Sequence, residues 1–426
     1  MGFTKRLRHR WSSSNFVRHA TTLAFGTLFA QFISFFSAPI VTRLFTPQDY
    51  GVLSVFSSWM MVVSVVATGR YEFAILLGDA REGWYSTVLT LLLTIVTALI
   101  LLVGGFMAAA AGLIATPLYG LLAALSVLAL GSNAGLYYWF NRNMRYPVLA
   151  RNRIYGSLVA AGLGIGAGVL GLGALGLVAG GVIAQLMVAL LLVWPSDFRA
   201  YPRPDTLVLK ELAWRYRDYP KYLLVSGLLD RFSSQAHILL LVFLQGAASS
   251  GFIGLYERVI SVPQRVLSGS IGDVFKQQAS SELATHGHCT ALYIRTTKRL
   301  ALIGIAPSLV LIVAGPWLFG LVFGTDWRVA GELAQLLAAK FYAGFIVSPL
   351  SSLLYIGQAQ RYDLYLQFGV AVCVPAGLFA GSMISGLKGA MVGYTAVYCC
   401  KYVVEYWIAW RVATGAFGKL AEPTSP

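Results

Sequence analysis

The chain has 426 residues, of which 57% are hydrophobic and 12% are charged, and its mean hydropathy is +0.70. A soluble protein carries roughly twice that charged fraction, so the composition excludes a soluble enzyme or a soluble binding domain. The net charge of +15 raises the question of nucleic-acid binding, but the distribution of the charge argues against it.

The N-terminus, MGFTKRLRHRW, is basic and precedes a long apolar stretch, as in a signal peptide. That stretch is long enough to cross a hydrocarbon core, and many similar stretches follow it. We therefore expect residues 1–19 to form a basic cytoplasmic segment that leads into an uncleaved first span.

Apolar segments of about 20 residues recur along the rest of the chain. The longest polar interruption, residues 195–219, divides them into two sets of six, so both halves would enter the membrane in the same direction. The expected fold is an all-α polytopic membrane protein with about 12 transmembrane helices in two six-helix lobes related by a parallel pseudo-repeat. We place the spans near 20–42, 50–68, 85–107, 117–139, 154–171, 173–194, 220–242, 247–272, 299–320, 330–355, 362–383 and 387–410.

These spans predict four further parts of the chain: an N-lobe over 20–194, a cytoplasmic linker over 195–219, a C-lobe over 220–411 and a cytoplasmic tail over 412–426. With the N-terminus inside, most Lys and Arg residues fall on the cytoplasmic side. Only Arg43, Arg328 and Lys388 fall outside, which is the asymmetry that membrane insertion favours. Both termini are therefore expected in the cytoplasm.

Internal similarity supports the repeat. The segment PQDYGVLSVF (47–56) aligns with AASSGFIGLY (247–256), so that Gly51 corresponds to Gly251 just ahead of the second span of each lobe. An Arg-Tyr pair follows the fourth span of each lobe, in MRYPV (144–148) and QRYDL (360–364). The shared positions relative to the spans favour a duplicated unit.

Polar residues interrupt several spans at helical spacing. In the span 247–272, Arg258, Ser261, Arg265, Ser268 and Gly272 follow one another at steps of three and four, which places them on one helical face. Charged groups in the membrane are costly, so this face must meet other helices or water.

Two interpretations of these charges stay open. They could form buried ion pairs with acids such as Asp230, Glu257 and Glu405, and the last of these lies one turn from Lys401. Alternatively, a surplus of bases could line a wet cavity that receives an anion, and guanidinium suits phosphate well. The candidate cationic site residues are Arg258, Arg265, Arg231, Lys340, Lys401 and Arg70.

No nucleotide-binding loop of the form G-x-x-x-x-G-K-[ST] occurs in the sequence, so transport by this chain is not expected to use ATP. The cysteines are interpreted as small apolar packing residues. No cofactor and no metal are therefore expected.

Two stretches resemble a known family. LFAQFISFFSAPIVTRLFTPQDYGVLSVF (28–56) with RYEFAILL (70–77) resembles the N-terminal signature of bacterial polysaccharide flippases. GFIGLYERVISVPQRVLSGSIGDVFKQQAS (251–280) resembles their eighth span and the loop after it. The chain is thus similar to Wzx-type lipid-linked oligosaccharide flippases, in the multidrug/oligosaccharidyl-lipid/polysaccharide exporter superfamily.

The resemblance implies a MATE-like fold in the bacterial inner membrane. It also implies transfer of undecaprenyl-diphosphate-linked oligosaccharide (an O-antigen, capsule or exopolysaccharide repeat unit) by alternating access. Cationic cavity residues would receive the diphosphate and sugar. An H⁺ or Na⁺ gradient or the membrane potential would drive transfer, with Asp230, Glu257 and Glu405 as candidate coupling carboxylates. Membrane lipids and other polysaccharide-assembly proteins are the expected partners, whereas the sugar, the coupling ion and the oligomeric state stay open.

Two alternatives remain. A MATE-type ion-coupled exporter of small molecules has the same architecture, but its cargo is usually cationic and would favour carboxylates. An O-antigen ligase or polymerase is equally hydrophobic, but it is an enzyme with a large external loop that carries catalytic Arg or His. The outer loops expected here are short, which favours a transporter over an enzyme.

Overall fold

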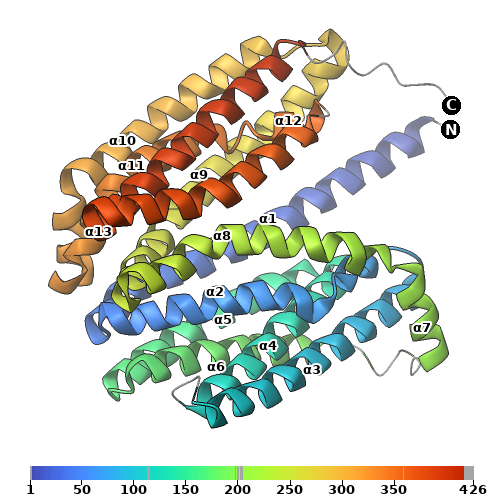
Figure 1. Ribbon diagram of the computed structural model, residues 1–426. Coiled ribbons are helices and arrows are strands. Elements are labelled where there is room, and N and C mark those ends of the chain that lie inside the picture. Colours follow the sequence, from blue (N-terminus) through green and yellow to red (C-terminus); the bar gives the residue numbers. More distant parts are fainter. Residues whose placement is uncertain are drawn as a thin grey trace. The chain divides into compact units, whose positions relative to one another are not determined.

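The computed structural model describes residues 2–112, 116–196, 198, 201, 205–357 and 359–416, although the side chains of 2–20, 261–263, 265–267 and 270 lie outside the description. Helices make up nearly all of this described part, and no strand occurs in it (Figure 1). The helices are α1 Gly2–Leu44, α2 Pro47–Thr68, η1 Tyr71–Leu76, α3 Ala80–Ala110, α4 Pro117–Arg142, α5 Tyr146–Val169, α6 Gly173–Val193, α7 Thr206–Arg215, η3 Tyr219–Leu223, α8 Leu224–Gln245, α9 Ala247–His286, α10 Thr290–Phe323, η4 Thr325–Trp327, α11 Arg328–Val347, α12 Ser352–Ile356 and α13 Gln360–Ala413.

Within the described residues, nine of these helices are long and apolar enough to cross a membrane. Helices α5 and α9 have comparable length but are more polar. The 54-residue helix α13 is interrupted at Ser385 and Gly386, where positive φ at Gly386 turns the chain back, so it supplies two spans. The expected all-α polytopic membrane fold is confirmed.

The chain separates into two compact units. The first comprises Met1–Phe45 and Val55–Gln235, and the second comprises Thr46–Ser54 and Ala236–Pro426, so α2 and α8 each contribute to both. In the first unit, α1 packs on α5, α3 on α4, and α6 on both α4 and α5. Its aromatic core includes Trp84, Trp139 and Phe140, which are buried together with Ile75 and Leu136.

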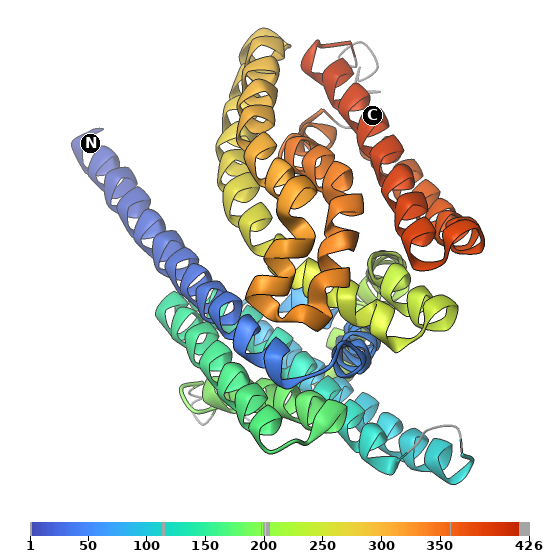
Figure 2. The same cartoon turned by 90° about the vertical axis from the view of Figure 1, so that its left-hand side faces the viewer.

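In the second unit, α11 packs against α9, α10 and α13. Figure 2 shows α10 and α11 running alongside each other in orange. Trp327 is fully buried at the start of α11, where Tyr50 and Phe252 make edge-to-face contacts with it. Such aromatic contacts add stabilisation to the apolar area that they bury.

Glycine pairs allow corresponding helices in the two units to approach closely. Gly105 of α3 meets Gly120 of α4, and Gly315 of α10 meets Gly331 of α11. In each pair, a β-carbon on one residue would collide with the backbone of the other helix, which is the packing that small residues permit in membranes. The third and fourth spans of both halves therefore pack in the same way, as a parallel repeat requires.

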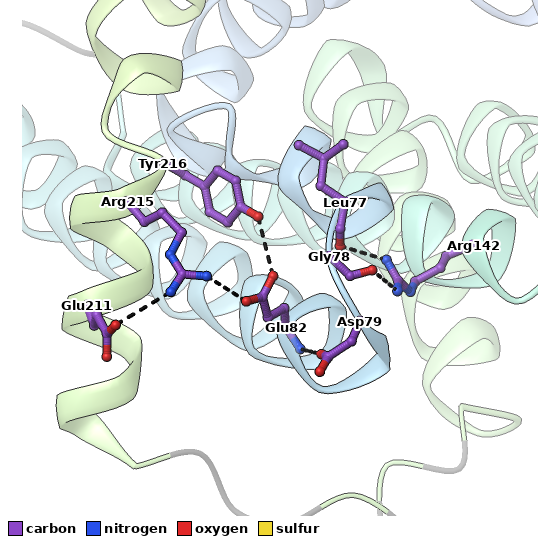
Figure 3. A network of polar contacts seen from close by, with 8 residues as sticks. All are labelled: Leu77, Gly78, Asp79, Glu82, Arg142, Glu211, Arg215 and Tyr216. Carbon is purple, nitrogen blue, oxygen red and sulfur yellow. Dashed lines mark hydrogen bonds and ion pairs between the residues drawn. The ribbon is translucent and has the colours of Figure 1, made fainter.

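The segment expected to be a linker contains the helix α7, which packs on α3. Arg215 of this helix pairs with Glu82 of α3 at 2.6 Å and with Glu211 at 3.5 Å (Figure 3). Burial, with a smaller contribution from Glu82, raises the pKa of Tyr216, whose hydroxyl donates to the Glu82 carboxylate. These contacts attach α7 to the first unit.

Arg142, at the end of α4, organises the neighbouring turn in Figure 3. Its guanidinium donates hydrogen bonds to the carbonyl oxygens of Ile75, Leu77 and Gly78 at 2.7–2.8 Å. Asp79 then caps α3 by accepting a hydrogen bond from the backbone N–H of Glu82. One arginine thus supplies hydrogen-bond donors to three carbonyl oxygens at the end of η1, where backbone N–H groups of a following helical turn are no longer available.

Candidate functional site

A cluster of ionisable and aromatic side chains lies inside the second unit, where α8, α9, α11 and α13 meet. Gly246 joins α8 to α9 with a positive φ, so the two helices form a hairpin. Across this hairpin, His237 Nε2 lies 2.7 Å from Glu257 Oε1. His237 is buried, whereas the Glu257 side chain keeps 36% of its surface exposed. The pair therefore joins a buried residue of α8 to a partly exposed residue of α9.

Lys340 of α11 joins the same cluster. Its ammonium group donates a hydrogen bond to the hydroxyl of Tyr394 at 2.9 Å, and it lies 4.4 Å and 4.7 Å from the ring centres of Tyr394 and Tyr398. The opposite charges of Lys340 and Glu257 attract each other. Aromatic faces and a nearby carboxylate are the surroundings that stabilise a cation inside a protein.

A row of tyrosines extends the cluster along α13. The His237 ring stacks on Tyr394 at 5.0 Å, and Tyr394, Tyr398 and Tyr402 contact one another at successive helical turns. The row ends at Lys401, whose ammonium group lies over the Tyr402 ring. Polar and aromatic groups thus line one face of α13 over several turns.

Lys401 and Glu405 form an ion pair at 2.5 Å, in agreement with the ion-pair interpretation of their spacing. Their side chains are 14% and 4% exposed, so the pair is shielded from water. Because Lys401 has this partner and Lys340 is engaged by Tyr394 and Glu257, both lysines neutralise charge within the protein. Lys340 and Lys401 are therefore less available to bind an anionic ligand than their number in the sequence suggests.

Arg258 is different. It lies on α9 next to Glu257 and is partly buried, and its charge acts on the buried Tyr50 hydroxyl. No ion pair joins Arg258 to a carboxylate in the part of the chain that the structure describes. A guanidinium without an acid partner is suited to an anionic ligand. The Arg265 side chain lies outside the described residues, as does that of Ser261, although their backbone belongs to α9.

The remaining candidates lie in the first unit. Arg70, which adopts a left-handed conformation between α2 and η1, pairs with the buried Glu72 at 3.7 Å and covers Phe73. Gly227 of α8 packs directly against its guanidinium. Asp230 and Arg231 are exposed on α8, and neither forms an ion pair with another described residue. These three residues belong to the first unit, whereas the cluster described above belongs to the second.

The hydrogen bond between His237 and Glu257 was missed by sequence reasoning. Glu257 was expected to form an ion pair or to couple an ion, but no partner on the preceding span was predicted for it. A histidine in the apolar run AHILLL, opposite an acid across a glycine turn, is the only local signal for this pair. The helical spacing of Tyr394, Tyr398, Lys401 and Glu405 was a stronger signal, because it lies within one helix.

Comparison with known proteins agrees with this architecture. Residues 40–332 match the family described as polysaccharide biosynthesis protein. No curated protein sequence matches the chain. Among solved structures, the lipid II flippase MurJ in an inward closed conformation is similar with a TM-score of 0.71 and 9% identity, over 92% of this chain and 89% of that chain.

Two other similar structures are transporters. One is a MOP superfamily transporter from Pyrococcus furiosus, with a TM-score of 0.61 and 13% identity over 94% of this chain and 96% of that chain. The other is a MATE transporter from Vibrio cholerae, with a TM-score of 0.56 and 15% identity over 94% and 98%. At these identities the similarity establishes the fold. The chain is a multi-pass membrane protein that belongs to the polysaccharide biosynthesis protein family.

Proposed function

We propose that this protein is a flippase for undecaprenyl-diphosphate-linked oligosaccharide in the bacterial inner membrane, with both termini in the cytoplasm. One observation carries the proposal: a member of the polysaccharide biosynthesis family has the fold found in a lipid II flippase. The structural neighbours are transporters, which supports transport rather than catalysis. The lipid tail would remain in the bilayer while the polar head group crosses between two lobes by alternating access.

The diphosphate would be bound by arginines of α9. Arg258 has a free charge among the described residues, and Arg265 lies two helical turns further along the same face. The planar guanidinium can donate two parallel hydrogen bonds from two nitrogens to one phosphate, a geometry that the single nitrogen of lysine does not provide. Lys401 and Arg70 each form an ion pair with a glutamate, and Lys340 donates a hydrogen bond to Tyr394, so these three cations are engaged within the protein.

Energy coupling would occur at Glu257. Its side chain is 36% exposed, and its carboxylate contacts the buried His237. Lys340, Tyr394 and Tyr398 surround this pair, so a change of charge at Glu257 would alter the packing of α8, α9, α11 and α13. Glu405 is less suited because it is buried and paired with Lys401. Asp230 is exposed on α8 and belongs to the first unit.

A MATE-type exporter of small molecules is the second candidate, because the Vibrio cholerae transporter shares the fold. The two functions differ in the charge that the site must bind. Glu257 and Glu405, the acids of the cluster, both have basic partners. Asp230 and Asp273, by contrast, are exposed and pair with no described residue, so the acids do not separate the two functions. The unpaired Arg258 favours an anionic cargo.

Reconstitution tests the proposal. Proteoliposomes would contain the purified protein and lipid-linked oligosaccharide. The oligosaccharide would be extracted from host cells that have been depleted of this protein. Transfer would be measured as the fraction of substrate that becomes accessible to a membrane-impermeant glycosidase. We expect transfer without ATP, stimulated by an ion gradient or membrane potential. Export of a cationic dye with no transfer of the lipid would instead support the MATE-type function.

Glu257→Gln tests the coupling site in the same vesicles. The substitution keeps the size of the side chain and a hydrogen bond to His237, but it removes the charge. We expect downhill exchange of substrate to continue while stimulation by the gradient is lost. Unchanged stimulation would remove Glu257 from the coupling mechanism.

A further inference from the structure

A cavity of about 470 Å³ lies in the second unit, between α9 and the end of α11. Ligand sites of proteins have volumes of roughly 300–1,000 Å³, so this space is large enough for a small organic group. Most of its lining surface is apolar, and polar groups are supplied by Ser268, Asp273, Lys276, Ser348, Ser351 and Tyr355.

The cavity forms where α11 ends and where the facing stretch of α9 carries glycines, which have no side chain. Helix α11 ends at Val347, and the turn through Pro349 leads to the short helix α12. On α9, Gly269 and Gly272 face this break, and Gly272 lies against Pro349. No described atom lies within 4 Å of the position that a β-carbon would occupy at Gly269. Interrupted helices commonly form binding sites in transporters, because their turns line a cavity.

The lining offers both donors and acceptors of hydrogen bonds. The hydroxyls of Ser268 and Ser351 donate to the backbone oxygens of Gln264 and Ser348, at 2.5 and 2.7 Å, which leaves their oxygen lone pairs available. Asp273 and Lys276 are exposed at the wall, and neither forms an ion pair with a described residue. Their charges are opposite, so these two residues together give no net attraction for an anion.

Tyr355 adds an aromatic surface. Its side chain is 55% exposed, and its hydroxyl donates a hydrogen bond to Asp363, which holds the ring in place. An apolar ring face beside several hydroxyl, carboxylate and ammonium groups matches a sugar, whose ring has an apolar face and a rim of hydroxyls. Among the described lining residues, a phosphate would find a single cation, Lys276, close in sequence to the acid Asp273.

We propose that this cavity binds a sugar residue of the lipid-linked head group. The inference rests on the proposed flippase function and names a second site within it. Gly269 lies three helical turns beyond Arg258 on α9, about 16 Å along the axis. One extended head group can therefore place its diphosphate at the arginines and a sugar in the cavity.

Filling the cavity tests the proposal. In Gly269→Trp, the new side chain starts in open space, so the protein should be made and inserted normally. The matched control is Gly369→Trp on α13, which also has no described atom within 4 Å of its β-carbon position and lies outside the cavity. The two substrates are undecaprenyl diphosphate without sugar and the lipid-linked oligosaccharide extracted from depleted host cells.

We expect Gly269→Trp to reduce transfer of the lipid-linked oligosaccharide by about tenfold or more, because the indole occupies the space of the sugar. Gly269→Trp should bind undecaprenyl diphosphate without sugar as well as the wild-type protein does. The control Gly369→Trp should behave like the wild-type protein with both lipids. Asp273→Asn, which removes a charge without changing the size of the side chain, should reduce transfer of the oligosaccharide to a smaller extent.

The outcomes are distinguishable. Undiminished transfer of the oligosaccharide by Gly269→Trp would overturn the sugar site while leaving the flippase function intact. Equal weakening for both lipids would assign the cavity to the diphosphate and would also overturn the inference. Failure of the wild-type protein to transfer the oligosaccharide would contradict the flippase function itself. If Gly269→Trp is absent from the membrane, unaltered transfer by Asp273→Asn would count against the site.

Discussion

Gly51 and Gly251, which occupy corresponding positions in the two halves of the sequence, pack against each other inside the second compact unit. A β-carbon at Gly251 would lie 2.9 Å from the backbone nitrogen of Gly51 and would overlap the carbonyl oxygen of Pro47. A β-carbon at Gly51 would overlap the carbonyl oxygen of Ala247. Because neither glycine has a side chain, the first turn of each helix can approach the backbone of the other. The contact is therefore reciprocal and joins α2 to α9.

This contact predicts that neither glycine accepts a side chain. Gly51→Ala and Gly251→Ala should each destabilise the protein by about 1–3 kcal/mol, because the colliding atoms belong to the backbone and cannot rotate away. Thermal unfolding in detergent and the protein level in membranes measure the effect. Gly369→Ala, which has open space around its β-carbon position, serves as the control. Wild-type stability of both variants would show that α2 and α9 do not approach each other this closely.

The arginines of α9 provide a test that separates binding from stability. Arg258→Ala should reach the membrane at nearly the wild-type level, because no described carboxylate is left without its partner. Transfer of lipid-linked oligosaccharide should be lost, and Arg258→Lys should be intermediate, since lysine keeps the charge but not the bidentate geometry. We expect the same order for Arg265→Ala and Arg265→Lys. An abundant and fully active alanine variant would remove that arginine from the site.

Breaking the ion pair of Lys401 and Glu405 should reduce stability, in contrast to removing Arg258, which should reduce transfer and leave the protein level nearly unchanged. Glu405→Leu leaves the Lys401 charge buried without a partner, so we expect a loss of about 3–5 kcal/mol in the free energy of unfolding. The double variant Lys401→Met, Glu405→Leu should recover most of this loss, because an apolar pair of similar volume replaces the ions. Chemical denaturation of all three variants provides the comparison. No recovery in the double variant would indicate a role beyond charge balance.

Cys289 allows a prediction about pH. Burial, with a smaller effect from Glu282, raises the pKa of this thiol to about 11. Because the thiolate is the reactive form, alkylation of folded protein should be slow near neutral pH and should accelerate as the pH approaches 11. By linkage, the contribution of this group to stability is present below its unfolded pKa of 9.0 and is lost as the pH rises through 11.

The measurement uses a variant in which alanine replaces Cys373, Cys399 and Cys400, so that only Cys289 reacts. Iodoacetamide labelling is followed over a pH series in detergent, with protein unfolded in dodecyl sulfate as the control. The unfolded protein should reach half its maximal rate at a lower pH. Equal pH profiles for folded and unfolded protein would contradict a buried thiol.

Several features follow from the sequence because they depend on local pattern. Apolar stretches of about 20 residues predict membrane helices whatever their neighbours are. The spacing of Lys401 and Glu405 predicts an ion pair because both residues lie on one helix, one turn apart. The alignment of Gly51 with Gly251 predicts that the two residues occupy equivalent positions in the two halves.

The contacts between helices required the tertiary structure. The bond between His237 and Glu257, the engagement of Lys340 by Tyr394, and the meeting of Gly51 with Gly251 all join different helices. Periodicity defines which face of a helix is polar, but it does not define the rotation and height of that helix relative to its neighbours. The cavity beside Gly269 depends on the same variables, because it forms only where the end of α11 lies opposite the glycines of α9.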